Sequence, residues 1–374
     1  MAVRSSCESN GPRQKDPTRR LPPGKTVMNM IAPRMGIAEI ARMARVATDL
    51  GSPFIGAVLA AGLRQLGRGP HSQSVITHWE GDPASAALAM RLNAALHFLA
   101  RRGNPPELAA LYRHEHDDFD GAIGAALAAE DDLIAGFLRR TPQTNEVGRS
   151  GAIVAALMEV RRRFGLPFEL LEIGSSCGLN LNLGRYGFDL GGVLAGDRHS
   201  PVQVAPEWHG PAPQPAPLEV VSARGVDLNP LSANDPATCE RLMAYIFADQ
   251  PQRLHRLEEA LGMARRNPPQ VEHGDASEWL AHQLAQPQPE GVCRVVMHSM
   301  VLQYLPARDR AAVVAMIHDA GQFATPERPL AWVGFEWTET RSEVRLSLSW
   351  FPGGEERRIL ATCHPYGNSV HWRG

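Results

Sequence analysis

The sequence has 374 residues, of which 44% are hydrophobic, 21% charged and 6% aromatic. A chain of this length and apolar content can bury a substantial core in one large domain or two, so disorder throughout is excluded. Its 38 basic and 40 acidic residues give a formal charge of −2, without the positive excess that nucleic acid or an anionic membrane attracts. We therefore expect neither nucleic acid nor a membrane as a partner.

The cysteines and the lack of long apolar runs indicate a cytoplasmic protein. Five cysteines without a C-x-x-C pair are typical of a reducing compartment. The most apolar window, around residues 84–99, contains Arg91, Asn93 and His97, so it is interpreted as a buried helix rather than a membrane span. The first 27 residues are polar and are predicted to form a disordered tail rather than a signal peptide.

Residues 28–145 are predicted to form an all-helical N-terminal cap. Gly51-Ser52-Pro53 predicts the end of one helix and the start of the next, because proline is favoured at the first helical position. Asp82-Pro83 and Asp131-Asp132 are start signals for two further helices, of which the second is expected to run to Arg139. No strand is predicted here, and the region has the size of a small domain.

Residues 146–374 are predicted to form an α/β core, beginning with a helix that ends at about residue 164. Strands and helices are then expected to alternate, which is typical of a parallel sheet with crossover helices. Two final strands around Gly353-Gly354 are predicted to pair as an antiparallel hairpin. Residues 185–217, rich in glycine and proline, are predicted to form an insertion. The expected strands cover 168–173, 218–227, 269–276, 293–305 and 329–337, and the expected helices cover 252–266, 277–284 and 307–320.

The segment LLEIGSSCGLNLN, residues 170–182, has the strongest functional signal. A buried strand, a loop with Gly174 and Gly178 and a following helix form an arrangement that brings backbone N–H groups to an anionic ligand. Asp227 ends the next predicted strand, where a carboxylate can accept both hydroxyls of a ribose, and Asp275 follows the third, where it can accept from an adenine amine. Capping of the adjoining helix is the alternative for both acids.

The sequence resembles the core of class I S-adenosylmethionine-dependent methyltransferases in three features. These are the acid-x-Gly-x-x-x-Gly loop, the acid after the second strand and the terminal hairpin. This resemblance implies a seven-stranded Rossmann-like methyltransferase sheet with S-adenosylmethionine as the cofactor. It implies further that Glu172, Gly174 and Gly178 border the methionine moiety, with Asp227 at the ribose and Asp275 at the adenine.

From about residue 51, through TNEVGR at 144–149 and the glycine-containing loop, the sequence resembles the bacterial domain-of-unknown-function 2332 family. That resemblance implies the same fold and supplies no substrate. Two features depart from the usual methyltransferase pattern. Ser176, also expected to border the cofactor, replaces the middle glycine, and 49 positions separate Gly178 from Asp227, which is far more than usual.

The acceptor side is expected to use His298 and Tyr304, with Glu336 after the next strand and with Glu146 and Arg149 from the helix that enters the core. Methyl transfer from a sulfonium needs alignment and, for some acceptors, removal of a proton, and no metal is expected. A cation near a helix N-terminus opposes the helix dipole, so Arg149 is a candidate for binding a carboxylate or phosphate. The hypothesis is methyl transfer to an unidentified small molecule, and the sequence does not determine the oligomeric state.

Two alternatives remain open. GSSCG satisfies the G-x-S-x-G pattern of α/β-hydrolases, which would make Ser176 a nucleophile with Asp275 and His364 as partners, although only helices precede it here. The other alternative is a methyltransferase-like binding or scaffold protein without catalysis, which Ser176 and the long insertion favour.

Overall fold

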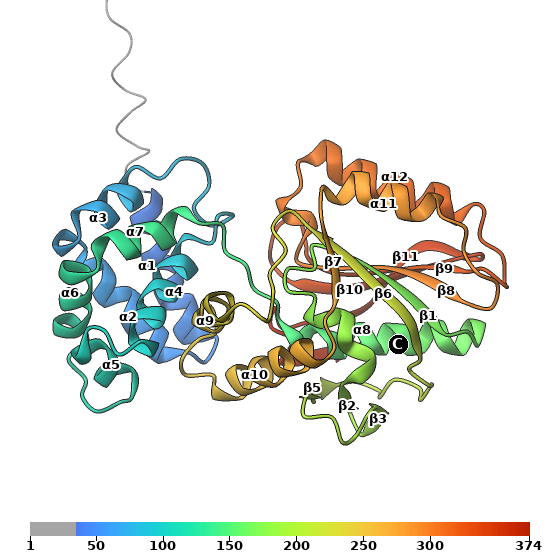
Figure 1. The fold of residues 1–374 in the computed structure, drawn as a ribbon, viewed down its shortest axis with the longest axis horizontal. Helices are drawn as coiled ribbons and strands as arrows, with labels where there is room; N and C mark the ends of the chain where they lie inside the picture. Colours follow the sequence, from blue (N-terminus) through green and yellow to red (C-terminus); the bar gives the residue numbers. More distant parts are fainter. Residues whose placement is uncertain (1–34) are drawn as a thin grey trace, which may run out of the picture.

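The computed structural model describes residues 35–374, so the tail predicted over residues 1–27 lies outside the described part. Figure 1 shows two lobes, one made of helices and one built around a sheet. The helical lobe encloses one cluster of buried apolar side chains, and the sheet lobe has one such cluster on each face of the sheet. The chain is therefore a mixed α/β protein with a helical part beside the sheet.

The helical lobe begins with seven α-helices whose starts follow the sequence signals in part. Pro53 and Asp131 are each the first residue of a helix, as predicted. The helix predicted directly after Asp82-Pro83 begins only at Leu88, because residues 83–87 form turns in which Ala87 has a left-handed φ of +52°. The helices are α1 (Met35–Asp49), α2 (Pro53–Arg64), α3 (Pro70–Thr77), α4 (Leu88–Arg101), α5 (Pro106–Tyr112), α6 (Phe119–Ala129) and α7 (Asp131–Arg139), with a 3-10 turn η2 (Leu66–Arg68) after α2.

A helix from the second half of the chain completes this lobe. α9 (Pro236–Ala244) lies against α4, and the buried side chains of Ala244, Tyr245 and Phe247 belong to the apolar cluster of the helical lobe. Nδ1 of His97 lies 2.9 Å from the carbonyl oxygen of Ile246, which links α4 to the segment after α9. The sequence signals did not predict this helix, which falls within the range expected for the α/β core.

The sheet of the second lobe has nine strands in the order β5-β12-β11-β10-β9-β8-β1-β6-β7. The five strands from β7 to β9 are parallel, whereas β9, β10, β11 and β12 form an antiparallel meander that contains the predicted hairpin. β12 and β5 add two strands to the seven that were expected. The strands are β1 (Phe168–Ile173), β5 (Glu207–His209), β6 (Val220–Asp227), β7 (Gln270–His273), β8 (Cys293–Ser299), β9 (Leu330–Trp337), β10 (Val344–Phe351), β11 (Gly354–Cys363) and β12 (Ser369–Trp372).

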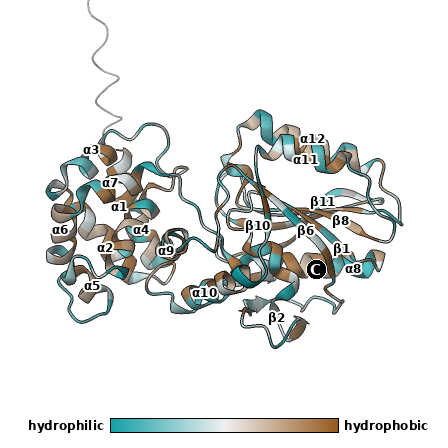
Figure 2. Ribbon diagram, in the orientation of Figure 1, coloured by the Kyte–Doolittle hydropathy of each residue, from teal (hydrophilic) through white to brown (hydrophobic). Residues whose placement is uncertain are grey.

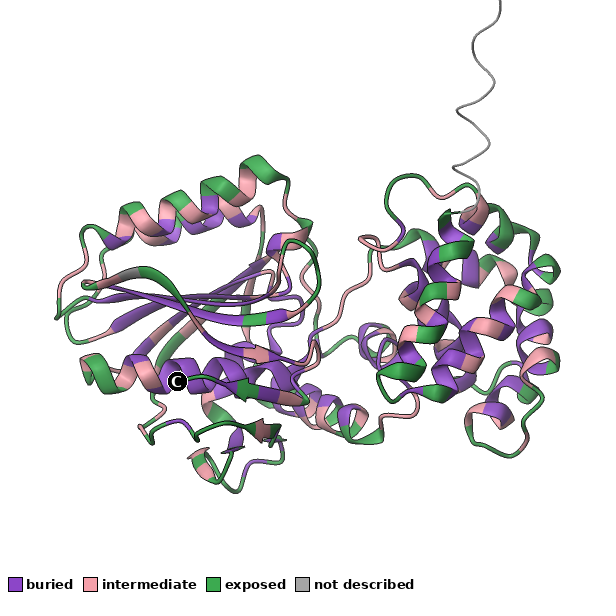
Figure 3. Cartoon of the chain, turned by 180° about the vertical axis from the view of Figure 1, so that it is seen from behind, coloured by how far each residue is buried: buried purple, intermediate pink, exposed green. Residues whose placement is uncertain are grey.

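Helices cover both faces of the parallel strands. α8 (Ser150–Phe164) and α10 (Pro251–Arg266) lie on one face, and α11 (Ala276–Ala285) and α12 (Ala307–Gly321) lie on the other (Figure 1). The central strands β1 and β8 are mostly hydrophobic in Figure 2, as expected for strands that are covered on both faces, and Figure 3 shows α12 buried toward the sheet and exposed outward. The chain passes from β1 outward to β6 and β7, then returns to β8 and β9, so the direction of winding reverses between β1 and β8.

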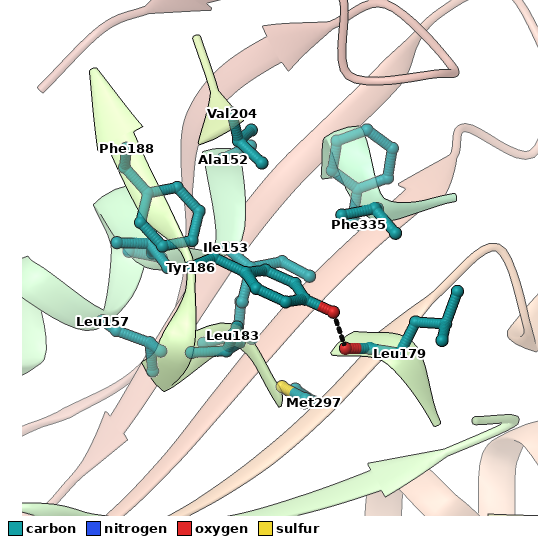
Figure 4. Close-up of a cluster of buried hydrophobic side chains, with 14 of the residues drawn as sticks. Ala152, Ile153, Leu157, Leu179, Leu183, Tyr186, Phe188, Val204, Met297 and Phe335 are labelled. Atoms are coloured by element: carbon teal, nitrogen blue, oxygen red, sulfur yellow. Dashed lines mark hydrogen bonds between the residues drawn. The ribbon is translucent and has the colours of Figure 1, made fainter. Parts of the chain in front are cut away.

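The segment between β1 and β6 contains the predicted insertion. The expected helix after the glycine-containing loop is a 3-10 helix, η4 (Leu179–Arg185). It is followed by a small sheet of β2 (Gly187–Leu190), β3 (Val193–Gly196) and β4 (Gln203–Val204). The fully buried Tyr186 joins these parts, because its hydroxyl donates to the carbonyl oxygen of Leu179 and its ring lies in the apolar cluster shown in Figure 4.

Candidate functional site

The carboxyl ends of the parallel strands and the linker from the helical lobe form the candidate site. β1 is followed by the glycine loop (residues 174–178), and β6, its parallel neighbour, ends at Asp227. The linker after α7 crosses this edge: Nε2 of Gln143 donates to the carbonyl oxygen of Asn229 at 2.8 Å, and Oδ1 of Asn145 accepts from the backbone N–H of Leu179 at 2.8 Å. Residues from three distant parts of the chain therefore meet here.

Asp227 is bonded directly to the glycine loop. Its Oδ2 accepts a hydrogen bond from the backbone N–H of Ser176 at 2.8 Å, and its Oδ1 accepts from that of Asn229 at 2.9 Å. The side-chain amide of Gln143 also approaches Oδ1, with its Nε2 at 3.5 Å, so three protein donors face a half-buried carboxylate that has about four acceptor positions. The structure thus brings together the loop and the acid that the sequence placed at one edge.

The backbone N–H groups of the loop are largely used within the protein, which corrects the expectation that they face a ligand. Those of Gly174 and Ser175 donate to the carbonyl oxygen of Val226 at 2.8 and 3.0 Å, and that of Gly178 donates to the Ser175 carbonyl at 2.7 Å. The N–H of Leu179, at the start of η4, is taken by the linker. The loop therefore offers a ligand few free donors.

Both glycines of the loop are explained by backbone conformation and internal packing. Gly174 and Gly178 have φ of +70° and +69°, which glycine adopts without strain. A Cβ on Gly174 would lie 2.3 Å from Cγ2 of Val301, and one on Gly178 would lie 2.6 Å from Cγ2 of Val271. Protein side chains, rather than an open notch, thus lie where the glycine Cβ atoms would be.

Three buried polar atoms near the end of β1 have no hydrogen-bond partner among the described residues. They are Oε2 of Glu172, Oγ of Ser176 and Oδ1 of Asn180. Burial raises the pKa of Glu172 to about 8, which hydrogen bonding with Ser175 and Asn180 only partly opposes. Acceptors of this kind fit donors such as an ammonium or hydroxyl group, both of which the implied cofactor has.

Asp275 has the capping role that was its alternative. Its Oδ1 accepts from the backbone N–H groups of Ser277 and Glu278, at 2.8 and 3.2 Å, at the start of α11. A side chain used in this way needs no ligand to explain its position. The structure therefore gives no separate support to a contact between Asp275 and an adenine.

His298 lies inside the protein and is not available to an acceptor, which corrects its predicted catalytic role. The residue is 0% exposed, its Nδ1 lies 2.7 Å from Oε1 of Glu336, and its Nε2 accepts from the indole N–H of Trp332 at 2.9 Å. The same Glu336 oxygen accepts from the backbone N–H groups of Val301 and Leu302. His298 and Glu336 therefore fix the segment after β8 to the end of β9.

Glu146 and Arg149 are also engaged inside the protein, against their predicted role at the acceptor. Glu146 forms a buried ion pair with Arg253, whose guanidinium stacks 3.7 Å from the ring centre of Tyr366. Burial alone would raise the pKa of Glu146, but the Arg253 guanidinium outweighs it and the pKa is lowered. Nε of Arg149 donates to the carbonyl oxygen of Pro365 at 2.9 Å, and its Nη1 donates to that of Ser299 at 3.3 Å, so the guanidinium is tied to backbone on two sides.

Tyr304 is the predicted acceptor-side residue that remains accessible. It belongs to the 3-10 turn η5 (Leu302–Tyr304) and its side chain is 56% exposed. Its charged neighbours include Arg149 and Arg341 of the sheet lobe and Arg91 of the helical lobe. Tyr304 therefore lies at the boundary between the lobes, beside the carboxyl edge of the sheet.

The hydrolase alternative is not assembled. Ser176 has a positive φ of +54°, which is compatible with the strained turn of a hydrolase nucleophile, but its buried Oγ has no hydrogen-bond partner among the described residues. Asp275 caps α11, and Nδ1 of His364 accepts from the backbone N–H of Tyr366 at 3.2 Å. Neither proposed partner is therefore hydrogen-bonded to the serine.

The described residues contain neither a cluster of metal ligands nor a membrane-spanning helix. Within residues 35–374, no group of three or more histidine, cysteine, aspartate or glutamate side chains is placed to hold a metal ion. No helix in the same range has the length and apolar content needed to cross a membrane. The described cysteines, Cys177, Cys239, Cys293 and Cys363, are free and buried.

The sequence interpretation missed the residues that close the site. Local sequence does not single out Val301, Val271 and Asn180, because an apolar residue in or just after a strand and an asparagine in a turn are common everywhere. Arg253 was missed because its partner, Glu146, lies 107 positions away. The one local hint of a buried ion pair is the presence of two charged residues, Glu146 and Arg149, in the otherwise uncharged segment TNEVGR.

A sequence profile of the family described as "Uncharacterized protein conserved in bacteria (DUF2332)" matches residues 38–372. The matched range runs through both lobes and includes the linker and the glycine loop. The search of curated proteins and the search of solved structures each returned no match. Because the profile covers nearly the whole chain, the protein belongs to the DUF2332 family.

Proposed function

We propose that this protein is an S-adenosylmethionine-dependent methyltransferase with a small-molecule acceptor. The observation that carries the proposal is the hydrogen bond between Asp227 and the glycine loop, which follows β1, the strand that borders the point where the winding of the sheet reverses. In open α/β sheets, ligands bind outside the carboxyl ends of the strands at such a point. The resemblance to class I methyltransferases supplies the identity of the ligand.

The residues present can supply hydrogen-bond acceptors for the hydroxyl and ammonium groups of the cofactor. Beside its three protein donors, Asp227 retains about one acceptor position for a ribose hydroxyl, and Ser176 and Asn180 have unpartnered oxygen atoms that suit an ammonium. Glu172 has an unpartnered oxygen too, but it keeps its proton up to a pH of about 8, so it suits a hydroxyl better than an ammonium. The backbone donors of the loop are excluded from this set, because most of them are already bonded. We therefore assign binding of the cofactor to side-chain oxygens rather than to the loop N–H groups.

When bound, S-adenosylmethionine supplies a methyl group on a sulfonium, a carbon that is already activated for displacement. The protein then has to orient the acceptor and exclude water. Tyr304 is the predicted acceptor-side residue with an exposed side chain, so we assign the acceptor contact to it. His298, Glu336, Glu146 and Arg149 act as positioning residues, because each is bonded inside the protein.

Calorimetric titration of the purified chain with S-adenosylmethionine tests the proposal. Saturable micromolar binding that Asp227→Ala removes would support it, and mass spectrometry of co-purified ligands would supply the acceptor class. Absence of binding to the folded wild-type chain would contradict it.

A second candidate is a binding or scaffold protein that keeps the sheet without using the cofactor. The packing of Val301 against Gly174 and the internal use of the loop N–H groups favour it. A Val301→Ala variant separates the two candidates. If the loop is merely narrowed, this variant binds S-adenosylmethionine more tightly than the wild type, whereas a scaffold protein binds it in neither form.

A further inference from the structure

A cleft lined by four arginines lies beside the end of β9, and none of the residues of the glycine loop lines it. It has a volume of about 830 Å³ and is formed by strands β9 to β11, the start of α12 and the turn between β9 and β10. Two glutamates line it against four guanidinium groups, so its lining has an excess of positive charge. We call it the arginine cleft and define it by Arg310, Arg341, Arg345 and Arg357.

One of these arginines, Arg345, has a carboxylate partner, and another, Arg341, is an exposed residue that is bonded to a serine hydroxyl of the other lobe. Nε of Arg345 donates to Oε1 of Glu343 at 2.7 Å, and Arg341 donates to Oγ of Ser85 in the helical lobe at 2.9 Å. Surface pairs of this kind contribute little to stability and need no ligand. The two arginines that remain are Arg357 and Arg310.

Arg357 is held in a fixed position without a carboxylate. Its Nε donates to Oγ of Ser347 at 2.7 Å, and its guanidinium lies over Trp332 at 4.8 Å from the ring centre. A Cβ on Gly334 would lie 2.7 Å from its Nη2, so the missing side chain at this position leaves room for the guanidinium on the floor of the cleft. Among the described residues, no carboxylate lies within ion-pair distance of it.

Arg310 faces the same cleft from a different element. It belongs to α12, whereas Arg357 belongs to β11, and it too has no ion pair with any side chain of residues 35–374. The acid nearest the floor, Glu336, is occupied by His298 and two backbone N–H groups through one oxygen. Two guanidinium groups without carboxylate partners therefore line one cavity.

We infer that the arginine cleft binds a small oxyanion, carrying a carboxylate or phosphate group, between Arg357 and Arg310. The planar guanidinium donates two parallel hydrogen bonds to such a group, and these charge-assisted bonds are among the strongest that side chains form. A ring stack and a serine hydroxyl hold Arg357 before the ligand arrives, which lowers the entropy lost on binding. The inference does not depend on methyl transfer, since a chain that binds no S-adenosylmethionine can bind an anion here.

Calorimetric titration of the full chain with inorganic phosphate and with succinate, at an ionic strength held constant with potassium chloride, tests this inference. Saturable binding of either anion is expected, and Arg357→Gln and Arg310→Gln should each weaken it on the order of tenfold or more. Arg358→Gln is the matched control, because Arg358 is adjacent in β11 but its guanidinium lies over Trp350 on the other side of the sheet. Its affinity should stay within about twofold of the wild type.

Two results would overturn the inference. One is the absence of saturable binding of both anions in the millimolar range by a folded wild-type chain. The other is equal weakening by Arg358→Gln and Arg357→Gln, which would indicate attraction by overall charge. Thermal unfolding of each variant checks the fold, and the S-adenosylmethionine titration is a separate measurement, so the two proposals can fail independently.

Discussion

The carboxylate of Asp227 accepts the backbone N–H of Ser176 at 2.8 Å, across two neighbouring parallel strands. One side chain thus fixes the glycine loop and remains half-buried at the carboxyl edge of the sheet. Its role in stability and its proposed role in binding therefore have to be separated by experiment.

Asp227→Ala is expected to abolish S-adenosylmethionine binding and to lower the free energy of unfolding by about 1–3 kcal/mol, because it leaves two backbone N–H groups without their acceptor. Calorimetry and urea denaturation measure the two effects. Asp235→Ala is the control, since Asp235 caps α9 by the same kind of backbone bonds, at 3.1 Å, outside the site. If Asp227→Ala binds S-adenosylmethionine as tightly as Asp235→Ala does, Asp227 is not part of the binding site.

Glu172→Gln is expected to flatten the dependence of stability on pH. The pKa of Glu172 is raised from 4.5 to about 8, so the folded state keeps a proton that the unfolded state releases. As the pH rises from 4.5 to about 8, Glu172 should therefore lower the free energy of unfolding of the wild type by about 1.4 kcal/mol per pH unit. The variant should not show this decrease. Urea denaturation at several pH values measures this, with the exposed Glu258→Gln as control. Identical slopes for Glu172→Gln and the wild type would contradict the assignment.

The Glu146–Arg253 pair is expected to behave as a coupled unit. Removing one partner leaves a buried charge unpaired, so Glu146→Gln should destabilise the protein by about 3–5 kcal/mol. Glu146→Gln combined with Arg253→Met should cost less than the sum of the single changes. A double-mutant cycle measured by urea denaturation decides this, and simple additivity would show that the two side chains do not interact.

His97 is expected to make the contact between α4 and the segment after α9 sensitive to acid. Burial, assisted by the nearby Arg101, lowers its pKa from 6.5 to about 4, so the unfolded state binds a proton before the folded state does. Its contribution to stability is therefore complete above pH 6.5 and is lost as the pH falls toward 4. His97→Gln should remove this loss, measured against the exposed His78→Gln. A parallel loss in both variants would assign the acid sensitivity to other groups.

Ser176 is expected not to react with a fluorophosphonate probe. Its buried Oγ has no hydrogen-bonded base among the described residues, and such a base is what activates a serine. Mass spectrometry after labelling measures the modification. Labelling of the wild type that disappears in Ser176→Ala would restore the hydrolase alternative.

The sequence by itself determined most elements of the sheet lobe and the proximity of Asp227 to the glycine loop. Strand β1 was predicted with its observed bounds, because a short apolar run between a helix and a glycine has one favourable place in an α/β sheet. Parallel neighbours end at one edge, so local patterns were sufficient to bring the loop and the acid together. α9 was missed, since its burial depends on packing against a helix more than 100 positions earlier.

Only the tertiary structure decided which polar groups are already used. His298 and Arg149 look like functional residues in the sequence, but both ring nitrogens of His298 are bonded to Glu336 and Trp332, and Nε of Arg149 donates to the Pro365 carbonyl. Arg357 looks like one arginine among many, yet it lines a cleft and forms no ion pair with any carboxylate of the described residues. A periodic pattern depends on neighbours along the chain, whereas the satisfaction of a buried polar group depends on partners that folding brings from anywhere in it.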